Sequence, residues 1–358
     1  MQVALALAGR GLGRVWPNPA VGCVIVRDGL PVGRGWTQPG GRPHAETEAL
    51  ARAGERARGA TAYVSFEPCC HHGATPPCTD ALIRAGIARL VTTMPDPDPR
   101  VAGRGLAQLS AAGIAIDCGL MEQQAQDLNA GFISRISTGR PLVALKLATT
   151  LDGRIATRGG ASKWITGELA RQRAHLLRAR YDGVMIGSGT ALADDPALTC
   201  RLPGLAEHSP VRIVVDSRLR LPPTAQLAVG AGAASTWCLT CSVDEGRRAA
   251  LSAAGVKIVD VAAGEDGRVD LGAALSTLGS RGLTRLLVEG GKELATSLLG
   301  AGLVDRVYWF RAPKLTGDDG LPAVASLGIE NIEALACWTR IAVQPLGEDL
   351  LETYTVPT

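Results

Sequence analysis

The chain has 358 residues, which is long for a single hydrophobic core and predicts two domains. Hydrophobic residues make up 46% of it and charged residues 20%, the composition of an ordinary globular protein. The formal net charge is only +3, without runs of Lys or Arg, which argues against a polymeric nucleic-acid substrate.

The opening segment, residues 1–14, predicts an amphipathic helix. It is apolar but short and is interrupted by Gly and Arg, so we expect neither a signal peptide nor a membrane span. The nine cysteines are an odd number and are typical of thiols kept reduced in the cytoplasm. Residues 21–36 then predict a β-hairpin, because two apolar runs flank the turn dipeptide Asp28-Gly29. Asn18, between two prolines before this hairpin, is either a turn former or a side chain whose amide binds the substrate.

A metal-binding pattern follows the hairpin. His44, Cys69 and Cys78 are suitable zinc ligands and leave one coordination position for water. Glu46, two residues after the histidine, can begin the same helix, stay off the metal and carry protons. A single His or Cys is more often a cap or a buried core residue, but this order of motifs favours a zinc deaminase. The spacing departs from the usual PCxxC signature, since eight residues separate the two cysteines.

Three neighbouring side chains compete for the same role as ligands. Cys70, His71 and His72 lie inside the loop between the two cysteines, and Cys70 is expected to point away from Cys69 within the same turn. A further alternative is a structural zinc, which would normally be closed by four protein ligands. In that case the second half of the chain would act as a nucleotide-sensing module.

Helices and strands alternate in the rest of the first half. We expect helices at residues 44–57, 79–86 and 103–113 and strands at 60–66, 89–94 and 114–119. This order predicts a three-layer α/β domain. Two of the zinc ligands then stand at helix N-termini, which favour thiolates over thiols. The Pro-rich loop at residues 95–105 follows a strand end, where ligand sites of α/β proteins gather.

A Gly-Arg-Pro turn places a domain boundary near residue 140, so we expect domains at residues 1–140 and 141–358. Lys146 lies within the apolar strand expected at residues 142–148. A buried lysine is costly unless it is paired or used, so Lys146 either faces a substrate pocket or reaches water from an edge strand. Residues 149–167 predict a long irregular loop, which in a compact domain is usually functional or disordered.

Three strand ends in the second half carry glycine or polar residues, at residues 187–190, 216–218 and 289–291. Backbone N–H groups in the two glycine turns can receive a phosphate, and at residues 216–218 the side chains of Ser217 and Arg218 could hold a ribose phosphate. Each turn alone is a weak signal and could be a plain turn, but the repeated arrangement favours a nucleotide cofactor. The domain is expected to be α/β, with a mostly parallel sheet, helices on both faces and an antiparallel edge from Thr339 onward.

Taken together, the segments HAE, EPCCHHGATPPC, DPDPRVAGRG and LKLATTLDGR resemble the bifunctional deaminase/reductase family of riboflavin biosynthesis, over essentially the whole chain. The resemblance implies a cytidine-deaminase-like N-terminal domain and a dihydrofolate-reductase-like C-terminal domain. It also implies that the zinc ligands and the proton carrier are the four residues named above. Two positions depart from the family pattern: Cys70 replaces the usual Ser, and Asp98 puts a carboxylate where an Asn is common.

For the C-terminal domain, the resemblance implies two sets of binding residues. The NADPH site would comprise Ala148, Trp164, Thr190, Asp194, Ser217, Gly291, Lys292, Glu293, Leu294, Ala295, Thr296 and Ser297. The substrate would be held by Ser162, Arg178, Leu198, Arg201 and Glu289, with Lys146 compatible with the same pocket. The planar forks of the two arginines suit a phosphate, although a lone Arg is more commonly a surface ion pair.

The function implied is that of an enzyme with two active sites. One zinc ion would support hydrolytic deamination of a phosphoribosyl diaminopyrimidine, and NADPH would then reduce the ribosyl group. We expect a small-molecule substrate, no nucleic-acid or membrane partner, and a cytoplasmic protein that can form a homo-oligomer. The alternatives are deamination of another nucleotide or of a tRNA base, and the nucleotide-sensing protein with a structural zinc.

Overall fold

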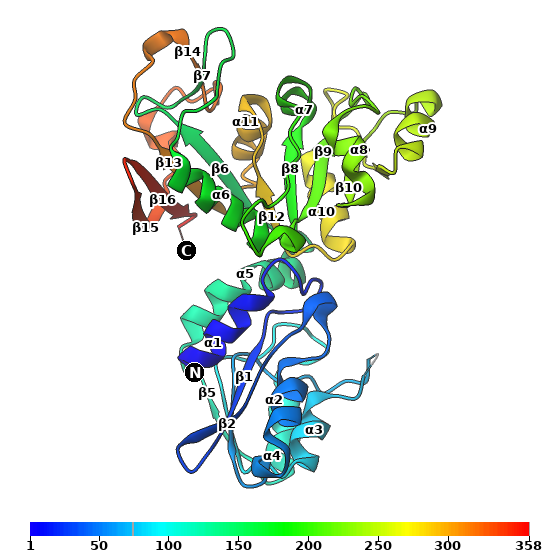
Figure 1. The fold of residues 1–358 in the computed structure, drawn as a ribbon, viewed down its shortest axis with the longest axis vertical. Coiled ribbons are helices and arrows are strands. Elements are labelled where there is room, and N and C mark those ends of the chain that lie inside the picture. The colour runs from blue at the N-terminus through cyan, green and yellow to red at the C-terminus, as the bar shows by residue number, and fades with distance from the viewer. Residues whose placement is uncertain (74, 358) are drawn as a thin grey trace. The chain divides into compact units, whose positions relative to one another are not determined.

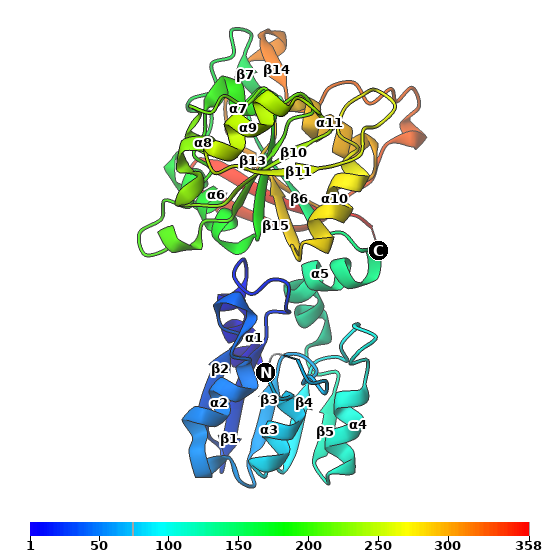
Figure 2. The same ribbon diagram turned by 90° about the vertical axis from the view of Figure 1, so that its right-hand side faces the viewer.

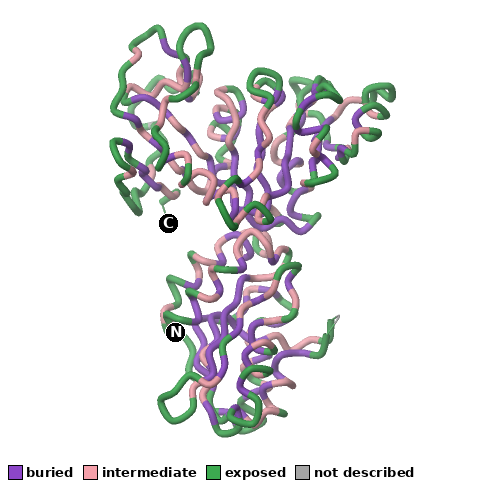
Figure 3. The backbone as a smooth tube through the Cα atoms, viewed as in Figure 1, coloured by how far each residue is buried: buried purple, intermediate pink, exposed green. Residues whose placement is uncertain are grey.

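The computed structural model describes residues 1–73 and 75–357, which form two compact units, Met1–Arg140 and Pro141–Thr358 (Figure 1). In each unit the buried segments gather along the central strands (Figure 3). All nine cysteines lie among the described residues and are free thiols. None of the described helices combines the length and the apolar character that crossing a bilayer requires.

The first unit is built on a sheet with the strand order β2-β1-β3-β4-β5, in which β1 is antiparallel to both neighbours and β3, β4 and β5 run parallel. The strands are β1 (Gly22–Arg27), β2 (Leu30–Trp36), β3 (Thr61–Val64), β4 (Arg89–Thr92) and β5 (Ala115–Cys118). The helices are α1 (Gln2–Ala8), α2 (Ala45–Ala53), α3 (Cys78–Arg84), α4 (Arg104–Ala111) and α5 (Glu122–Thr138). Helices α1 and α5 cover one face and α2, α3 and α4 the other, as predicted for three layers (Figures 1 and 2).

Close packing of α2 on β2 sets the position of the helix N-terminus. The predicted hairpin is confirmed: Asp28 and Gly29 form its turn with φ of 50° and 75°. Beyond the turn, β2 carries Gly33 and Gly35 where α2 crosses it, and a Cβ at Gly35 would collide with the carbonyl oxygen of Ala45. The absence of side chains there lets the helix backbone lie directly on the strand, which directs the start of α2 to one edge of the sheet.

The second unit contains a larger sheet with the strand order β11-β10-β9-β8-β12-β6-β13-β16-β15. It is parallel from β11 to β13, and β16 and β15 add an antiparallel edge, as predicted. Its strands are β6 (Leu142–Thr149), β8 (Gly183–Gly187), β9 (Val211–Val215), β10 (Thr236–Thr240), β11 (Lys257–Asp260), β12 (Arg285–Val288), β13 (Arg306–Arg311), β15 (Thr339–Leu346) and β16 (Asp349–Thr355). A separate small sheet pairs β7 (Arg154–Thr157) with β14 (Gly320–Pro322).

Helices cover both faces of this sheet, with α10 and α11 on one face and α6, α8 and α9 on the other (Figure 2). They are α6 (Glu168–Arg180), α7 (Ser188–Asp194), α8 (Gln226–Val229), α9 (Glu245–Ala253), α10 (Leu271–Ser280) and α11 (Lys292–Gly300). The chain leaves β6, passes the position of β12 to form β8, and returns to β12 later. Ligands of open α/β sheets bind where the strand order reverses in this way.

The structure excludes one of the two alternatives for Lys146, and one expectation for the second unit was wrong. Strand β6 lies between β12 and β13, so Lys146 does not stand on an edge strand. Residues 149–167 are not irregular throughout, because Arg154–Thr157 forms β7. The partner of β7 is β14, a pairing between segments far apart in the sequence that local patterns do not reveal.

Candidate active sites

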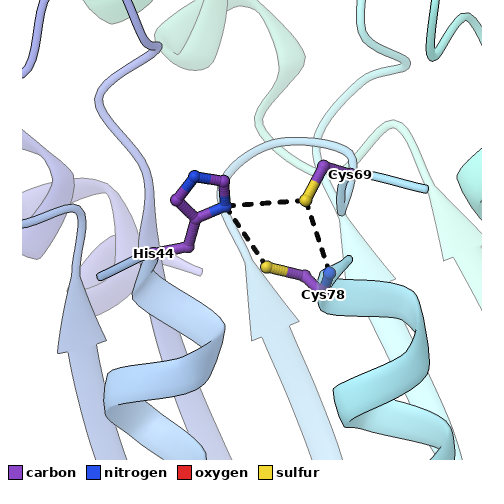
Figure 4. A group of neighbouring side chains, drawn as sticks. All are labelled: His44, Cys69 and Cys78. Carbon is purple, nitrogen blue, oxygen red and sulfur yellow. Dashed lines mark hydrogen bonds between the residues drawn. The ribbon is translucent and has the colours of Figure 1, made fainter. Parts of the chain in front are cut away.

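The three predicted zinc ligands converge at one edge of the first sheet (Figure 4). His44 is the N-cap of α2, Cys78 begins α3, and Cys69 lies in the loop that follows β3. The Nδ1 atom of His44 lies 3.5 Å from Sγ of Cys69 and 3.4 Å from Sγ of Cys78. A tetrahedral zinc with bonds of about 2.3 Å to sulfur and about 2.0 Å to nitrogen requires an N···S separation of about 3.6 Å. The donor set therefore fits a zinc ion.

The electrostatics of this triad favour a thiolate at Cys69. The side chain of Cys78 donates to the sulfur of Cys69, and this hydrogen bond, with the contact to His44, lowers the pKa of Cys69 to about 4. The backbone N–H of Cys78 also donates to the same sulfur, at 3.3 Å. The pKa of Cys78 is correspondingly raised, by its hydrogen bond to Cys69 and by burial. A thiolate beside an imidazole is the form in which these residues bind a metal.

Glu46 lies in the first turn of α2 and is only 3% exposed. Burial and the negative charge of Cys69 raise the pKa of Glu46 to about 7. A carboxyl group with such a pKa can both accept and return a proton at neutral pH. Cys70 lies outside the triad, with its Sγ 3.9 Å from the carbonyl oxygen of Arg100. In the described part of the chain, His44, Cys69 and Cys78 form the only group of three or more His, Cys, Asp or Glu residues whose potential metal-ligand atoms lie within 4.8 Å of one another.

The side chains of two predicted polar residues, Asn18 and Asp98, make hydrogen bonds to other residues of the chain. The side-chain amide of Asn18 donates to the carbonyl oxygen of Gly41 at 2.9 Å. The carboxylate of Asp98 is buried and accepts from the Arg100 guanidinium at 2.5 Å and from the Arg100 backbone N–H at 2.9 Å. The hydrogen bond from Arg100 lowers the pKa of Asp98 below its ordinary value. At this departure from the family pattern, the additional negative charge is thus compensated inside its own loop.

The second unit has two cavities at the carboxyl ends of β6, β8 and β12, of about 410 Å³ and about 260 Å³. Both are bordered by Lys146, Ala148, Ser162 and Glu289. The larger cavity is also lined by six further residues predicted for the cofactor: Thr190, Asp194, Gly291, Lys292, Glu293 and Leu294. The smaller is lined by Trp164, Arg178 and Arg201. Residues predicted to bind NADPH and residues predicted to bind the substrate therefore lie together on the wall that the two cavities share.

Five predicted residues do not line either cavity. Leu198 is buried with an exposure of 3%, and Ala295 is fully buried in α11. The hydroxyl of Ser217 accepts from the backbone N–H of Val269 at 2.9 Å. Thr296 donates to the carbonyl oxygen of Lys292, and Ser297 lies one residue further along the same helix. The side chains of Ser217 and Thr296 are thus engaged in hydrogen bonds within the chain.

A buried cluster of charges separates the two cavities. The Nε and Nη2 atoms of Arg178 donate to the two carboxylate oxygens of Glu289 at 2.6 Å and 2.9 Å. Nζ of Lys146 lies 3.8 Å from the same carboxylate. Arg178 is thus part of a buried ion pair rather than a surface pair. Burial lowers the pKa of Lys146, although the charge of Glu289 opposes this effect.

Sequence reasoning missed two basic side chains in the smaller cavity, Arg171 and His175, and burial lowers the pKa of His175 below its ordinary value. The guanidinium of Arg171 lies 4.4 Å from the ring centroid of Trp164, and Nδ1 of His175 accepts from the backbone N–H of Arg201. A signal was available: both residues precede Arg178 in α6 at helical spacing, so the three side chains share a face. Arg171 and Arg201 carry positive charge at this cavity, which suits an anionic group.

Each of the two units matches a known protein family. The family model of the RibD C-terminal domain matches residues 141–351, and that of the cytidine and deoxycytidylate deaminase zinc-binding region matches residues 1–94. The riboflavin biosynthesis protein RibD of Escherichia coli (strain K12) is 45% identical, over 98% of this chain and 96% of the relative. RibD of Aquifex aeolicus is 42% identical, over 98% and 96%.

Solved structures agree. Acinetobacter baumannii RibD, form 1, matches with a TM-score of 0.90 at 38% identity, covering 100% of this chain and 98% of that chain. A Thermotoga maritima structure, described as a diaminohydroxyphosphoribosylaminopyrimidine deaminase/5-amino-6-(5-phosphoribosylamino)uracil reductase, matches with a TM-score of 0.87 at 34% identity, covering 100% and 97%. The predicted resemblance is confirmed: the chain belongs to the RibD family of riboflavin biosynthesis, as a bifunctional enzyme with a zinc-binding deaminase domain followed by a reductase domain.

Proposed function

We propose that this enzyme first deaminates 2,5-diamino-6-(5-phosphoribosylamino)pyrimidin-4(3H)-one and then reduces the product with NADPH to 5-amino-6-(5-phosphoribitylamino)uracil. The observation that carries the proposal is the His44, Cys69 and Cys78 triad with the buried carboxyl group of Glu46 beside it. The substrates follow from the activities named for the Thermotoga maritima relative. We assign deamination to residues 1–140 and reduction to residues 141–358. The free thiols support a cytoplasmic location.

In the deaminase site, His44, Cys69 and Cys78 would hold one zinc ion and leave a position for water. Zinc, when bound, supplies an acidified water as the nucleophile. Glu46 is not one of these ligands and stands beside them, where it accepts a proton from the water and later delivers a proton to the amine that departs as ammonia. Its pKa of about 7 allows both transfers at neutral pH. The backbone N–H of Cys78, the first residue of α3, donates to Sγ of Cys69 at 3.3 Å and helps to stabilise the negative charge of Cys69.

In the reductase site, the larger cavity suits NADPH, which when bound supplies the hydride. The turn into α11 lies against Thr190, which is also predicted for the cofactor: the N–H of Gly291 donates to Oγ1 of Thr190 at 2.9 Å, and a Cβ at Gly291 would crowd that hydroxyl. The smaller cavity suits the phosphoribosyl substrate, with Arg201 directed to its phosphate. Lys146 and Ser162, on the shared wall, hold the sugar carbon and the donor in register, which is the main requirement for hydride transfer.

Two activities measured separately test the assignment. Ammonia release is followed on the diaminopyrimidine substrate, and NADPH oxidation is followed on substrate that has already been deaminated. We expect Glu46→Gln to keep one zinc per chain and to lose deamination by about 100-fold or more, because the proton carrier is gone. Reduction should be unchanged. If both activities fall together while the protein stays folded, the assignment of separate sites is wrong.

A further inference from the structure

Glu67 is a buried carboxylate that the deaminase chemistry does not use. It lies two residues ahead of Cys69, is only 4% exposed, and forms no ion pair with any described Lys or Arg. Its oxygens accept hydrogen bonds from four backbone N–H groups of the described chain. Oε2 accepts from Asp96 at 2.8 Å and Gly103 at 2.9 Å, and Oε1 from Gly105 at 2.9 Å and Leu106 at 3.2 Å. Burying a carboxylate is unfavourable unless such charge-assisted hydrogen bonds replace its hydration.

The four donors mark both ends of the Pro-rich loop. Asp96 lies just after β4, where the loop begins, and Gly103 is the N-cap of α4, where it ends. The N–H groups of Gly103, Gly105 and Leu106 belong to the start of α4, where a helix has no internal acceptors and carries its positive dipole end. One side chain thus caps α4 and closes the loop in front of it.

Inside the Pro-rich loop, carboxylates also accept hydrogen bonds from backbone N–H groups. Oδ1 of Asp96 accepts from the backbone N–H of Asp98 at 2.8 Å, and Oδ1 of Asp98 accepts from that of Arg100 at 2.9 Å. The loop follows β4, and the loop that carries Cys69 follows β3, its parallel neighbour, so both leave the same edge of the sheet as the metal triad. The contact of Cys70 with the Arg100 carbonyl oxygen joins the two loops.

Helix α4 is also pressed against the peptide next to Glu67. A Cβ at Gly105 would collide with the carbonyl oxygen of Pro68 and would lie 3.1 Å from Oε1 of Glu67. Only glycine therefore lets α4 reach this carboxylate. The segment of Glu67 and Pro68 leads directly into Cys69, so the carboxylate connects the ligand-bearing loop to the Pro-rich loop.

We propose that Glu67 is a positioning residue of the deaminase site: it fixes the Pro-rich loop, residues 95–103, relative to the metal triad, and through that loop it orients the pyrimidine. The proposal concerns a side chain that does not touch the reacting atoms. Its effect on catalysis rests on the proposed deaminase function, whereas its effect on the loop does not.

Hydrogen exchange measures the effect on the loop directly. In Glu67→Gln one oxygen is replaced by an NH₂ group that faces N–H donors, so part of the set loses its acceptor. We expect the amides of Asp96, Gly103, Gly105 and Leu106 to exchange about tenfold faster or more, while those of α2 and α3 keep their protection. Glu55→Gln, at an exposed position of the same unit, is the matched control and should leave all of these rates unchanged.

The kinetic measurement uses the same full-length proteins. For Glu67→Gln we expect one zinc per chain, unchanged reduction of deaminated substrate, and a kcat/KM for deamination about tenfold lower or more, mainly through a higher KM. Gly105→Ala should reproduce this pattern with Glu67 intact, because the added Cβ displaces α4 from the carboxylate. Its control is Gly246→Ala, where the nearest atom to the new Cβ lies 3.5 Å away in ordinary contact.

The outcomes separate the two proposals. Loop amides that exchange at the wild-type rate in both variants overturn the role of Glu67, and so does a loosened loop with unchanged deamination kinetics. Loss of zinc in either variant would mean that Glu67 supports Cys69 itself, which also overturns it. A wild-type protein that releases no ammonia from the diaminopyrimidine refutes the proposed function, while the exchange result still decides whether Glu67 holds the loop.

Discussion

Neutralising Glu289 gives the sharpest test of the charge cluster in the reductase unit. The side chain of Glu289 is 8% exposed and lies against the cations of Arg178 and Lys146. Burial alone would raise the pKa of this carboxyl, but the two positive charges outweigh burial and lower the pKa from its ordinary value of 4.5 to about 2. Each unit of such a shift corresponds to about 1.4 kcal/mol, so the ionised form stabilises the fold by about 3 kcal/mol.

The sign of the effect follows from the depressed pKa. The stabilisation is fully present above pH 4.5, where unfolded Glu289 is ionised, and is lost as the pH falls toward about 2. We expect Glu289→Gln to lower the free energy of unfolding at pH 7 by about 3 kcal/mol or more, because two buried cations lose their counter-charge. At pH 3.5 the deficit should be about 1 kcal/mol smaller, since the wild-type protein has by then lost part of its advantage.

Urea unfolding followed by circular dichroism and tryptophan fluorescence at the two pH values measures this difference. The substitution lies in the second unit, so only that unit's transition should shift. Glu245→Gln is the control, because Glu245 has a side-chain exposure of 88% and its distance to Arg248 is 3.9 Å. A deficit for Glu289→Gln that is the same at pH 7 and pH 3.5, or no deficit at pH 7, would refute the reasoning.

Two other predictions address the metal and the shared wall of the cavities. Removal of zinc with a chelator should abolish ammonia release and leave NADPH oxidation on deaminated substrate intact, and added zinc should restore the lost activity; metal analysis and both assays check this. Lys146→Met should lower kcat/KM for reduction by about tenfold or more without changing deamination, because the cation at the wall common to both cavities is removed. Steady-state kinetics of the two reactions measure this, and an unchanged kcat/KM for reduction would contradict the prediction.

Local signals in the sequence predicted most of the framework. Asp28-Gly29 identified the hairpin, and the order of the motifs that carry His44, Cys69 and Cys78 identified the metal triad, although the spacing of the two cysteines departs from the usual signature. What the sequence did not reveal depends on contacts between distant segments. Strand β7 exists through its pairing with β14, and Lys146 is interior because β12 and β13 flank its strand. The acceptor role of Glu67 was invisible for a related reason: its partners are backbone N–H groups, which carry no sequence signature.

The two units use buried glutamates in opposite ways, and the surroundings of each explain the difference. Glu46 and Glu289 are both largely removed from water. Beside Glu46 the largest influence after burial is the negative charge of Cys69, and the pKa rises to about 7. Beside Glu289 two cations reverse the effect of burial, and the pKa falls to about 2. Glu46 can therefore exchange a proton at neutral pH, as a hydrolytic deaminase requires, whereas Glu289 stays ionised and serves as a fixed anchor for Arg178 and Lys146. Burial beside a negative charge raises the pKa of one glutamate, and burial beside two positive charges lowers the pKa of the other, so the neighbouring charges decide the role of each.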